Sequence, residues 1–156
     1  MKTSELEFKP INNADNTFEL FYELIKNEPQ IDIPKKDDWL GECIYEIHHN
    51  NNLVGFVVYS RYDDDFCLSC IYIFKEKRNR GIATATLRKV MNTLKGKCNL
   101  LYGFVCKNND IAINIYRKLG FRFLSNERLY NILNPSEDKC ILQNDFYEFG
   151  VKLWKR

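Results

Sequence analysis

Long apolar runs are missing from this sequence, and no stretch reaches the ~18 residues that a membrane-spanning helix requires. The first ten residues are polar and lack the apolar core of a secretion signal. Net charge is also scarce, because the formal value of +2 is too small to indicate a nucleic-acid-binding protein. From these absences we expect a cytoplasmic protein without a membrane or nucleic-acid partner.

Internal repeats and low-complexity linkers are absent as well. At 156 residues the chain is long enough for one domain with a sizeable core, and too short for two domains of ordinary size. Hydrophobic residues make up 45% and charged residues 28%, which is typical of a globular protein. We therefore expect residues 1–156 to form a single domain.

Metal-ligand patterns in the sequence are incomplete. Cys67 and Cys70 have C-x-x-C spacing, but they fall in a predicted strand, where positions three apart point to opposite faces and cannot share one ion. No second C-x-x-C pair or spaced His pair completes a site. His48 and His49 adjoin the Asn run at 50–52, so we interpret them as solvated turn residues. We expect no metal, and we expect the six cysteines to be reduced and mostly buried.

The apolar pattern predicts strands and helices in a mixed order. Predicted strands cover residues 5–11, 43–49, 53–60, 66–74, 99–106, 121–127 and 146–153. Predicted helices cover residues 17–27, 81–95 and the segment around Tyr116, with a loop or short helix at 32–41. Because a helix follows each of two central strands, we expect a mixed sheet that contains a local parallel pair.

The most informative stretch is R-N-R-G-I-A at residues 78–83, between a strand-like run and a helix with apolar residues at helical spacing. A helix that begins soon after a strand leaves its first backbone N–H groups unpaired at its positive dipole end. Gly81 has no side chain to block an anion there, and Lys75 and Lys77 add positive charge. The spacing matches neither G-x-x-x-x-G-K-[ST] nor G-x-G-x-x-G. We interpret this turn as a cradle for a pyrophosphate.

A second pattern, N-D-I-A-I-N-I-Y-R-K-L-G-F, spans residues 109–121. Asn109 or Asp110 can accept hydrogen bonds from first-turn N–H groups, and Gly120 is suited to end the helix. Taken alone, Tyr116 would be read as a half-buried packing residue. The predicted apolar face of this helix consists of Ile111, Ile115 and Leu119.

Together the two patterns resemble the signatures of the GNAT family of N-acetyltransferases. The first is similar to its acetyl-CoA-binding motif, Gln/Arg-x-x-Gly-x-Gly/Ala, and the second to N-x-x-A-x-x-h-Y-x-K-x-G-F, where h is apolar. The close resemblance covers residues 71–121, about a third of the chain. It implies an α/β fold of the GNAT type: a mixed, mostly antiparallel central sheet with a splayed parallel strand pair, flanked by helices on both faces.

The resemblance also implies acetyl-CoA as co-substrate and assigns its contacts. Backbone donors of residues 78–84 would hold the pyrophosphate, the strand at 72–74 would pair with the pantetheine, and Asn109 would fix the strand end or the pantetheine arm. The implied cofactor residues are Tyr72, Ile73, Phe74, Arg78, Asn79, Arg80, Gly81, Ile82, Ala83, Thr84, Asn109 and Tyr116.

The reaction implied is attack of a neutral primary amine on the thioester carbonyl. The Ile73 backbone N–H is the candidate donor to the carbonyl oxygen as it gains negative charge. Tyr116 is the candidate acid for the departing thiolate, since a phenol with an ordinary pKa of ~10 is protonated near neutral pH. We expect direct transfer within a ternary complex, with Tyr116 and Ile73 as the catalytic groups.

No residue is a clear candidate for the base that removes a proton from the amine. Family members carry a Glu eleven residues before the first motif or five before the motif Asn, and here these positions are Cys67 and Phe104. A water relay without a dedicated base is equally consistent. The carboxylates that might substitute, each more typical of a surface charge, are Asp65, Glu46 and Glu148.

The acceptor is specified only as a primary amine of a small molecule or peptide. Residues 30–46 and 131–144 carry several acidic side chains, which would attract a cationic amine, although solvated loops explain them as well. Exposed strand edges near the carboxyl terminus favour a homodimer. Two rival functions stay open: an acyl-CoA sensor without turnover, and an interaction domain whose basic turn docks acidic partners.

Overall fold

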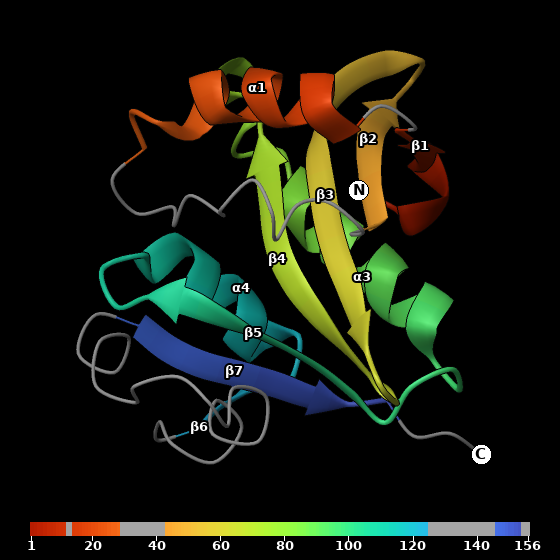
Figure 1. Cartoon of the computed structure of the whole chain (residues 1–156), viewed down its shortest axis with the longest axis vertical. Helices are drawn as coiled ribbons and strands as arrows, with labels where there is room; N and C mark the ends of the chain where they lie inside the picture. The colour runs from red at the N-terminus through yellow and green to blue at the C-terminus, as the bar shows by residue number, and fades with distance from the viewer. Residues whose placement is uncertain (12–13, 29–42, 125–145, 154–156) are drawn as a thin grey trace.

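The computed structural model describes residues 1–11, 14–28, 43–124 and 146–153 (Figure 1). The helices are α1 (Ala14–Ile25), α3 (Ile82–Leu94) and α4 (Asp110–Lys118), with 3₁₀ turns at Thr3–Glu5 and Lys75–Lys77. The strands are β1 (Leu6–Pro10), β2 (Cys43–His49), β3 (Asn52–Tyr62), β4 (Asp65–Ile73), β5 (Leu100–Cys106), β6 (Arg122–Leu124) and β7 (Phe146–Lys152). The expected loop or short helix at 32–41 lies outside the described residues.

These strands form one seven-stranded sheet in the order β1-β2-β3-β4-β5-β7-β6. Every neighbouring pair is antiparallel except β4 and β5, which are parallel. The parallel pairing runs from Phe66↔Leu101 to Leu68↔Gly103 and stops there, although both strands continue. From that point β4 and β5 diverge like the arms of a V, as Figure 1 shows. The expected mixed sheet with a splayed parallel pair is confirmed.

A β-bulge lies where the two strands separate. Tyr59 pairs with Leu68 and Val58 pairs with Cys70, so Ser69 is an extra residue of β4 between these two pairs. An extra residue shifts the alternation of side chains, and Leu68 and Cys70 indeed pack in opposite core layers. Cys67 and Cys70 therefore point to the same face of the sheet. Our prediction of opposite faces for this pair was wrong, because regular alternation was assumed through the bulge.

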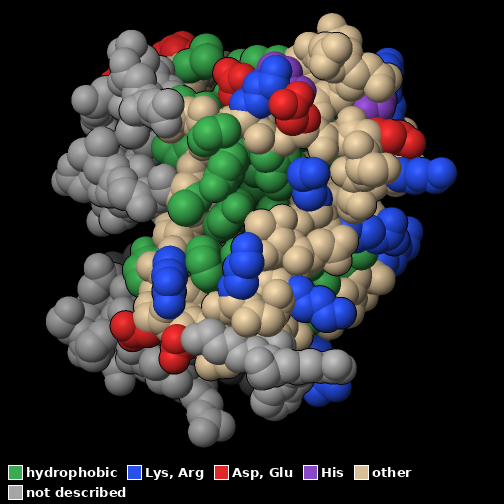
Figure 2. All heavy atoms as spheres, turned by 90° about the vertical axis from the view of Figure 1, so that its right-hand side faces the viewer, with side chains coloured by type: hydrophobic (Ala, Val, Ile, Leu, Met, Phe, Trp, Pro, Cys, Tyr) green, Lys and Arg blue, Asp and Glu red, His purple; other side chains and the backbone are tan. Residues whose placement is uncertain are grey.

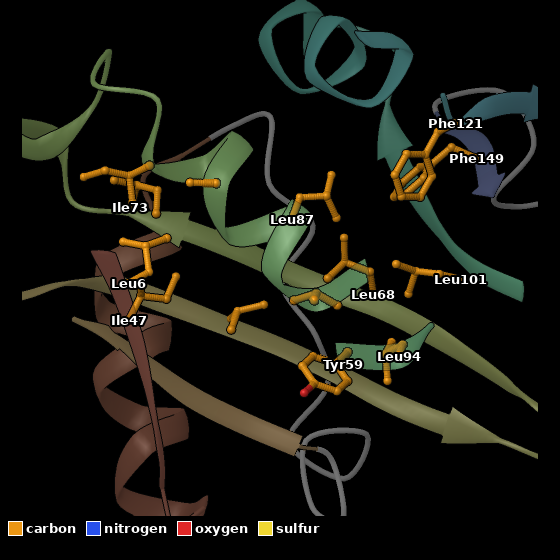
Figure 3. Close-up of a cluster of buried hydrophobic side chains, with 14 of the residues drawn as sticks. Leu6, Ile47, Tyr59, Leu68, Ile73, Leu87, Leu94, Leu101, Phe121 and Phe149 are labelled. Carbon is orange, nitrogen blue, oxygen red and sulfur yellow. The ribbon is translucent and has the colours of Figure 1, made fainter. Parts of the chain in front are cut away.

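Two hydrophobic layers cover the sheet. On one face, side chains of α3 and α4 pack against the strands, and Figure 3 shows Leu87 of α3 beside Leu68, with Phe121 and Phe149 together further along. On the other face, Phe21 and Ile25 of α1 pack against a smaller cluster that includes Phe56, Val58 and Tyr72. Helices thus flank both faces, as expected. The apolar spacing of α3 places Leu87, Val90 and Leu94 in the core.

Two local predictions are corrected by burial. His48 and His49 belong to β2 rather than to the turn, and the His48 side chain is only 12% exposed and lies 2.8 Å from the Glu46 carboxylate. Ile111 was predicted on the apolar face of α4, yet it is 74% exposed, and the residue that this helix buries is Ile113.

The face of the molecule in Figure 2 carries a patch of hydrophobic side chains bordered by Lys and Arg. It lies on the side of β1, which is one edge of the sheet, while β6 forms the other edge. In the part of the chain that the structure describes, no helix is long and apolar enough to cross a bilayer. The homodimer stays a prediction.

Replacement of Gly103 tests how tightly the strands pack where the V opens. A Cβ added there would lie 2.8 Å from the Leu68 carbonyl oxygen and 2.6 Å from the Phe149 ring. We expect Gly103→Ala to lower the free energy of unfolding by about 1–3 kcal/mol, measured by denaturant titration. Gly150→Ala is the matched control on β7, because its Cβ would meet no atom closer than 3.3 Å. Equal stability of both variants would contradict the packing described here.

Candidate functional site

A cavity of about 360 Å³ lies at the open end of the V. It is bounded by β4, by the turn between β4 and α3, and by the first turns of α3 and α4. All the predicted cofactor residues line this cavity except Phe74 and Arg80. The structure therefore gathers two sequence motifs about thirty residues apart around a single space.

The main chain at the end of β4 presents polar groups to this space. The Phe74 N–H donates to the Val54 carbonyl (3.0 Å), and Gly55 pairs with Ile73. In an antiparallel ladder, hydrogen-bonded and non-hydrogen-bonded pairs alternate, so the N–H of Ile73 points away from β3 and into the gap left by β5. The Phe74 carbonyl accepts from Lys77 N–H (2.8 Å), so the main chain of Phe74 is engaged within the fold.

The N-terminus of α3 is open to the cavity. Its N-cap, Gly81, has a left-handed conformation (φ 76°), and no side chain caps the first turn. A Cβ at Gly81 would meet only Met1, at 4.0 Å, so the approach to the first N–H groups is clear. Asn79 also has a positive φ of 60°. An uncapped helix N-terminus with exposed N–H groups is a suitable site for an anion.

Arg78, the first residue of the motif, is engaged in contacts with the protein. Its Nε donates to the Ile73 carbonyl (2.9 Å), and a terminal guanidinium nitrogen lies 2.8 Å from Glu28 Oε1. The guanidinium also lies over the Tyr72 ring, 5.4 Å from its centroid. Arg78 therefore ties the end of β4 to the chain that follows α1, and its role in the structure is to position these elements.

Glu28 is a residue of the cavity wall that the sequence did not predict. It lines the cavity, is 6% exposed, and is also 3.7 Å from the Lys75 ammonium. The hydrogen bond from Arg78 lowers the pKa of this carboxyl from its ordinary 4.5, while burial opposes the shift. Because the pKa of Glu28 is lowered in the folded protein, the pair contributes its full stabilisation at pH values above the ordinary pKa. This stabilisation is lost as the pH falls through the lowered pKa.

Helix α4 begins and ends as its sequence predicts. Asn109 is the N-cap, and its Oδ1 accepts from the Ala112 N–H at 3.2 Å. Gly120 follows the helix with φ 86°, and its N–H donates to the Arg117 carbonyl. The Asn109 side chain is thus used to start the helix at the cavity wall.

Tyr116 projects from α4 toward the gap. Its ring stacks on Phe149 of β7, with centroids 3.9 Å apart, and lies 5.5 Å from the Phe121 ring. Burial raises the pKa of the Tyr116 phenol above its ordinary value of 10.0, and the nearby Cys70 thiol acts in the same direction. The phenol is therefore fixed in place and protonated at neutral pH.

The three carboxylates considered as bases have different surroundings. Asp65 Oδ1 accepts from the Leu100 N–H (3.0 Å) at the closed end of the V. Glu46 is on β2 and pairs with His48. Glu148 is 5% exposed, which contradicts the expectation of a surface charge for this residue.

The described cysteines, which leave out Cys140, are all thiols; Cys70 and Cys98 are buried, whereas Cys43, Cys67 and Cys106 are partly buried. Among the described residues, no group of three His, Cys, Asp or Glu side chains is arranged to hold a metal ion. The side chains that gather at the cavity thus offer N–H groups, positive charge and a phenol.

The fold is a mixed α/β fold in which a splayed parallel strand pair adjoins an uncapped helix N-terminus, and comparison with known proteins identifies the family. A model of the acetyltransferase (GNAT) family matches residues 11–121. That region is more than half of the chain. The protein therefore belongs to the GNAT family of acetyltransferases.

Curated relatives and solved structures agree with this assignment. A probable spermine N(1)-acetyltransferase of Bacillus subtilis subsp. natto is 29% identical over 96 residues, which cover 53% of this chain and 63% of that protein. The match thus spans less than two thirds of this relative's length. Spermidine N-acetyltransferase from Vibrio cholerae, solved with CoA and spermine, superposes with a TM-score of 0.68 at 14% identity, covering 96% of both chains.

A GNAT family acetyltransferase from Elizabethkingia anophelis, solved with acetyl-CoA bound, superposes with a TM-score of 0.63 at 18% identity. That alignment covers 96% of this chain and 99% of the other. At such identities the superpositions establish the fold.

Removal of the Arg78 guanidinium tests the tie between β4 and α1. Arg78→Met removes the closer cation from the buried Glu28 carboxylate and leaves the exposed Lys75 ammonium 3.7 Å away. Breaking a fully buried pair costs about 3–5 kcal/mol, and because Arg78 is one-third exposed we expect about 1–3 kcal/mol by denaturant titration. Arg80→Met, at an exposed position in the same turn, is the control and should change stability by less than about 0.5 kcal/mol. Similar losses in both variants would contradict the positioning role.

Proposed function

We propose that this protein is an acetyl-CoA-dependent N-acetyltransferase. The observation that carries the proposal is that the uncapped N-terminus of α3, the gap-facing N–H of Ile73 and the buried phenol of Tyr116 border one cavity. Family membership and relatives named as spermine acetyltransferases support the same activity.

The shape and chemistry of the cavity suit coenzyme A. Its pyrophosphate would lie on the N–H groups after Gly81, with Lys77 lining the same space. Its pantetheine arm would follow β4 through the gap in place of the missing strand. The main chain of Phe74 and the Ile73 carbonyl are engaged within the fold, so the gap-facing groups of Ile71 would pair with the arm and the Ile73 N–H would be left for the thioester carbonyl. The exposed Ile111 at the cavity wall would gain an apolar partner.

In the reaction, the nitrogen of a neutral amine forms a bond to the thioester carbonyl carbon. The Ile73 N–H donates to the carbonyl oxygen while it carries negative charge. When the carbon–sulfur bond breaks, the electron pair leaves on sulfur, and the Tyr116 phenol supplies the proton to the thiolate. The nitrogen loses one proton to solvent as the amide forms, and a proton from solvent restores the phenol. The raised pKa of the Tyr116 phenol keeps this proton available over the whole neutral range. The products are an N-acetylated amine and free CoA.

The acceptor that we propose is a small cationic amine of the polyamine class. The support is the sequence match to a probable spermine acetyltransferase, because the residues that line the described cavity are those proposed for the cofactor. The acidic segments at 30–46 and 131–144, which would meet the acceptor, lie almost entirely outside the described residues. A sensor that binds acyl-CoA without turnover is the rival function.

Substitution at Gly81 tests the phosphate cradle. Gly81→Ala places a methyl group over the open N-terminus of α3, and we expect the Kd for CoA, measured by calorimetry, to rise about tenfold or more. Gly96→Ala is a closely matched control, because Gly96 has nearly the same φ (77° against 76°) with nothing within 4 Å of its Cβ. Both variants carry the same backbone strain, so unchanged CoA affinity in Gly81→Ala would place the phosphates elsewhere.

Substitution at Tyr116 tests catalysis. With acetyl-CoA and spermine, thiol release by the wild-type chain should saturate, and Tyr116→Phe should lower kcat about 100-fold with little change in the Kd for CoA. The phenylalanine ring keeps the stacking on Phe149, so the fold should persist. Equal turnover of the variant and the wild type would remove the acid role. Binding of acetyl-CoA without thiol release across a panel of amines would favour the sensor.

A further inference from the structure

The described site contains the cavity proposed for the cofactor and the candidate acid Tyr116. At the two positions where members of the family carry a Glu, this chain has Cys67 and Phe104. The strand register shows which groups surround these positions. Cys67 pairs with Tyr102 across the parallel ladder, and Phe104 pairs with Glu148 across the antiparallel ladder between β5 and β7. Glu148 therefore places a carboxylate directly opposite Phe104, one of the two positions where a family carboxylate is missing.

Glu148 also lies on the required face of the sheet. Residues directly opposite in an antiparallel pair share a face, with Cβ atoms ~4.5–5.5 Å apart. Phe104 and Tyr102 alternate with Gly103, so Cys67, Tyr102, Phe104 and Glu148 all share the face on which α1 packs. Phe149, the next residue, points to the other face and supports the Tyr116 ring.

This arrangement places the Tyr116 phenol and the Glu148 carboxylate on opposite faces of the sheet at the gap between β4 and β5. The Tyr116 phenol approaches the gap from the face covered by α3 and α4. An amine that attacks the carbonyl carbon must approach from outside the thioester plane, and the face away from Tyr116 is the one that carries Glu148. The amine would thus approach from the face that carries Glu148, and the departing sulfur would be protonated from the face that carries Tyr116.

The other candidate bases do not have this geometry. The Asp65 carboxylate accepts a hydrogen bond from the Leu100 N–H at the end of the V where β4 and β5 are still paired. Glu46 lies on β2, where it pairs with His48. Glu148 is also 5% exposed, and a carboxylate in such surroundings attracts an ammonium group more strongly than one in water does.

We propose that Glu148 receives the acceptor amine and removes its proton, taking on from β7 the role of the carboxylate absent at residue 104. This inference rests on the proposed function. The ammonium first pairs with the carboxylate and then gives a proton to it, directly or through one water. The neutral nitrogen then bonds to the carbonyl carbon, and the proton held by Glu148 passes to solvent after the product leaves.

The test compares Glu148→Gln with the wild-type chain, using acetyl-CoA and spermine. A carboxamide has nearly the same shape but cannot take the proton, so we expect kcat/KM for spermine to fall about 100-fold or more. The Kd for CoA should stay within about twofold of the wild-type value, and the denaturant midpoint should be close to that of the wild-type chain. Wild-type turnover in this variant would overturn the inference, as would a parallel loss of CoA affinity.

A second-site variant makes the test specific to position. In the double variant Glu148→Gln/Phe104→Glu, a carboxylate returns to the same face one strand away, and we expect at least a tenfold recovery of kcat/KM. No recovery would leave Glu148 a structural residue and contradict the inference.

A conservative variant covers the case in which Glu148→Gln does not fold. Glu148→Asp keeps the charge but withdraws the carboxylate by one methylene, so we expect about a tenfold loss of kcat with CoA binding unchanged. Full activity of that variant would count against the inference. A wild-type chain that turns over no amine would instead contradict the proposed function itself, which separates the two outcomes.

Discussion

The site depends on the separation of β4 from β5 after Leu68 and Gly103. A sheet normally pairs its backbone groups, and an unmet N–H or C=O in its interior costs about 1–3 kcal/mol. Here the extra residue Ser69 turns the end of β4 away from its parallel neighbour, and the N–H of Ile73 faces the opening. The fold therefore maintains an unfilled strand position, and a ligand with amide groups is the natural occupant.

The two arms of the opening are held by different layers. The β4 arm is tied to the α1 side by Arg78, which bonds both Ile73 and Glu28, and by the Tyr72 ring packed edge-on against Phe21. The β5 arm pairs with β7, whose Phe149 carries the Tyr116 ring of α4. Both arms also contribute side chains to the hydrophobic layer under α3 and α4, with Leu68 and Ile73 from β4 and Leu101 from β5, so the two arrangements meet in one core (Figure 3).

The elements and most of the residues that line the cavity were predictable, because their signals are local. The capping residue Asn109, the terminating Gly120 and the apolar spacing of α3 act within one or two helical turns. The bulge at Ser69 was not predictable, since it depends on register against β3 and β5 and reversed the expected face of Cys70. Glu28 was missed for a similar reason: its partner Arg78 is fifty positions away along the chain.

The proposed role of Glu148 would explain, through charge alone, which acceptors the site prefers. Under this proposal a cationic amine would approach a face that carries a buried carboxylate, where opposite charges attract more strongly than in water. An alcohol of the same shape brings no charge, so it gains less from the same face. Acetylation turns the ammonium into a neutral amide, which removes the attraction that drew the substrate in. The same carboxylate then favours amines over alcohols as acceptors and weakens the binding of the product it helped to form.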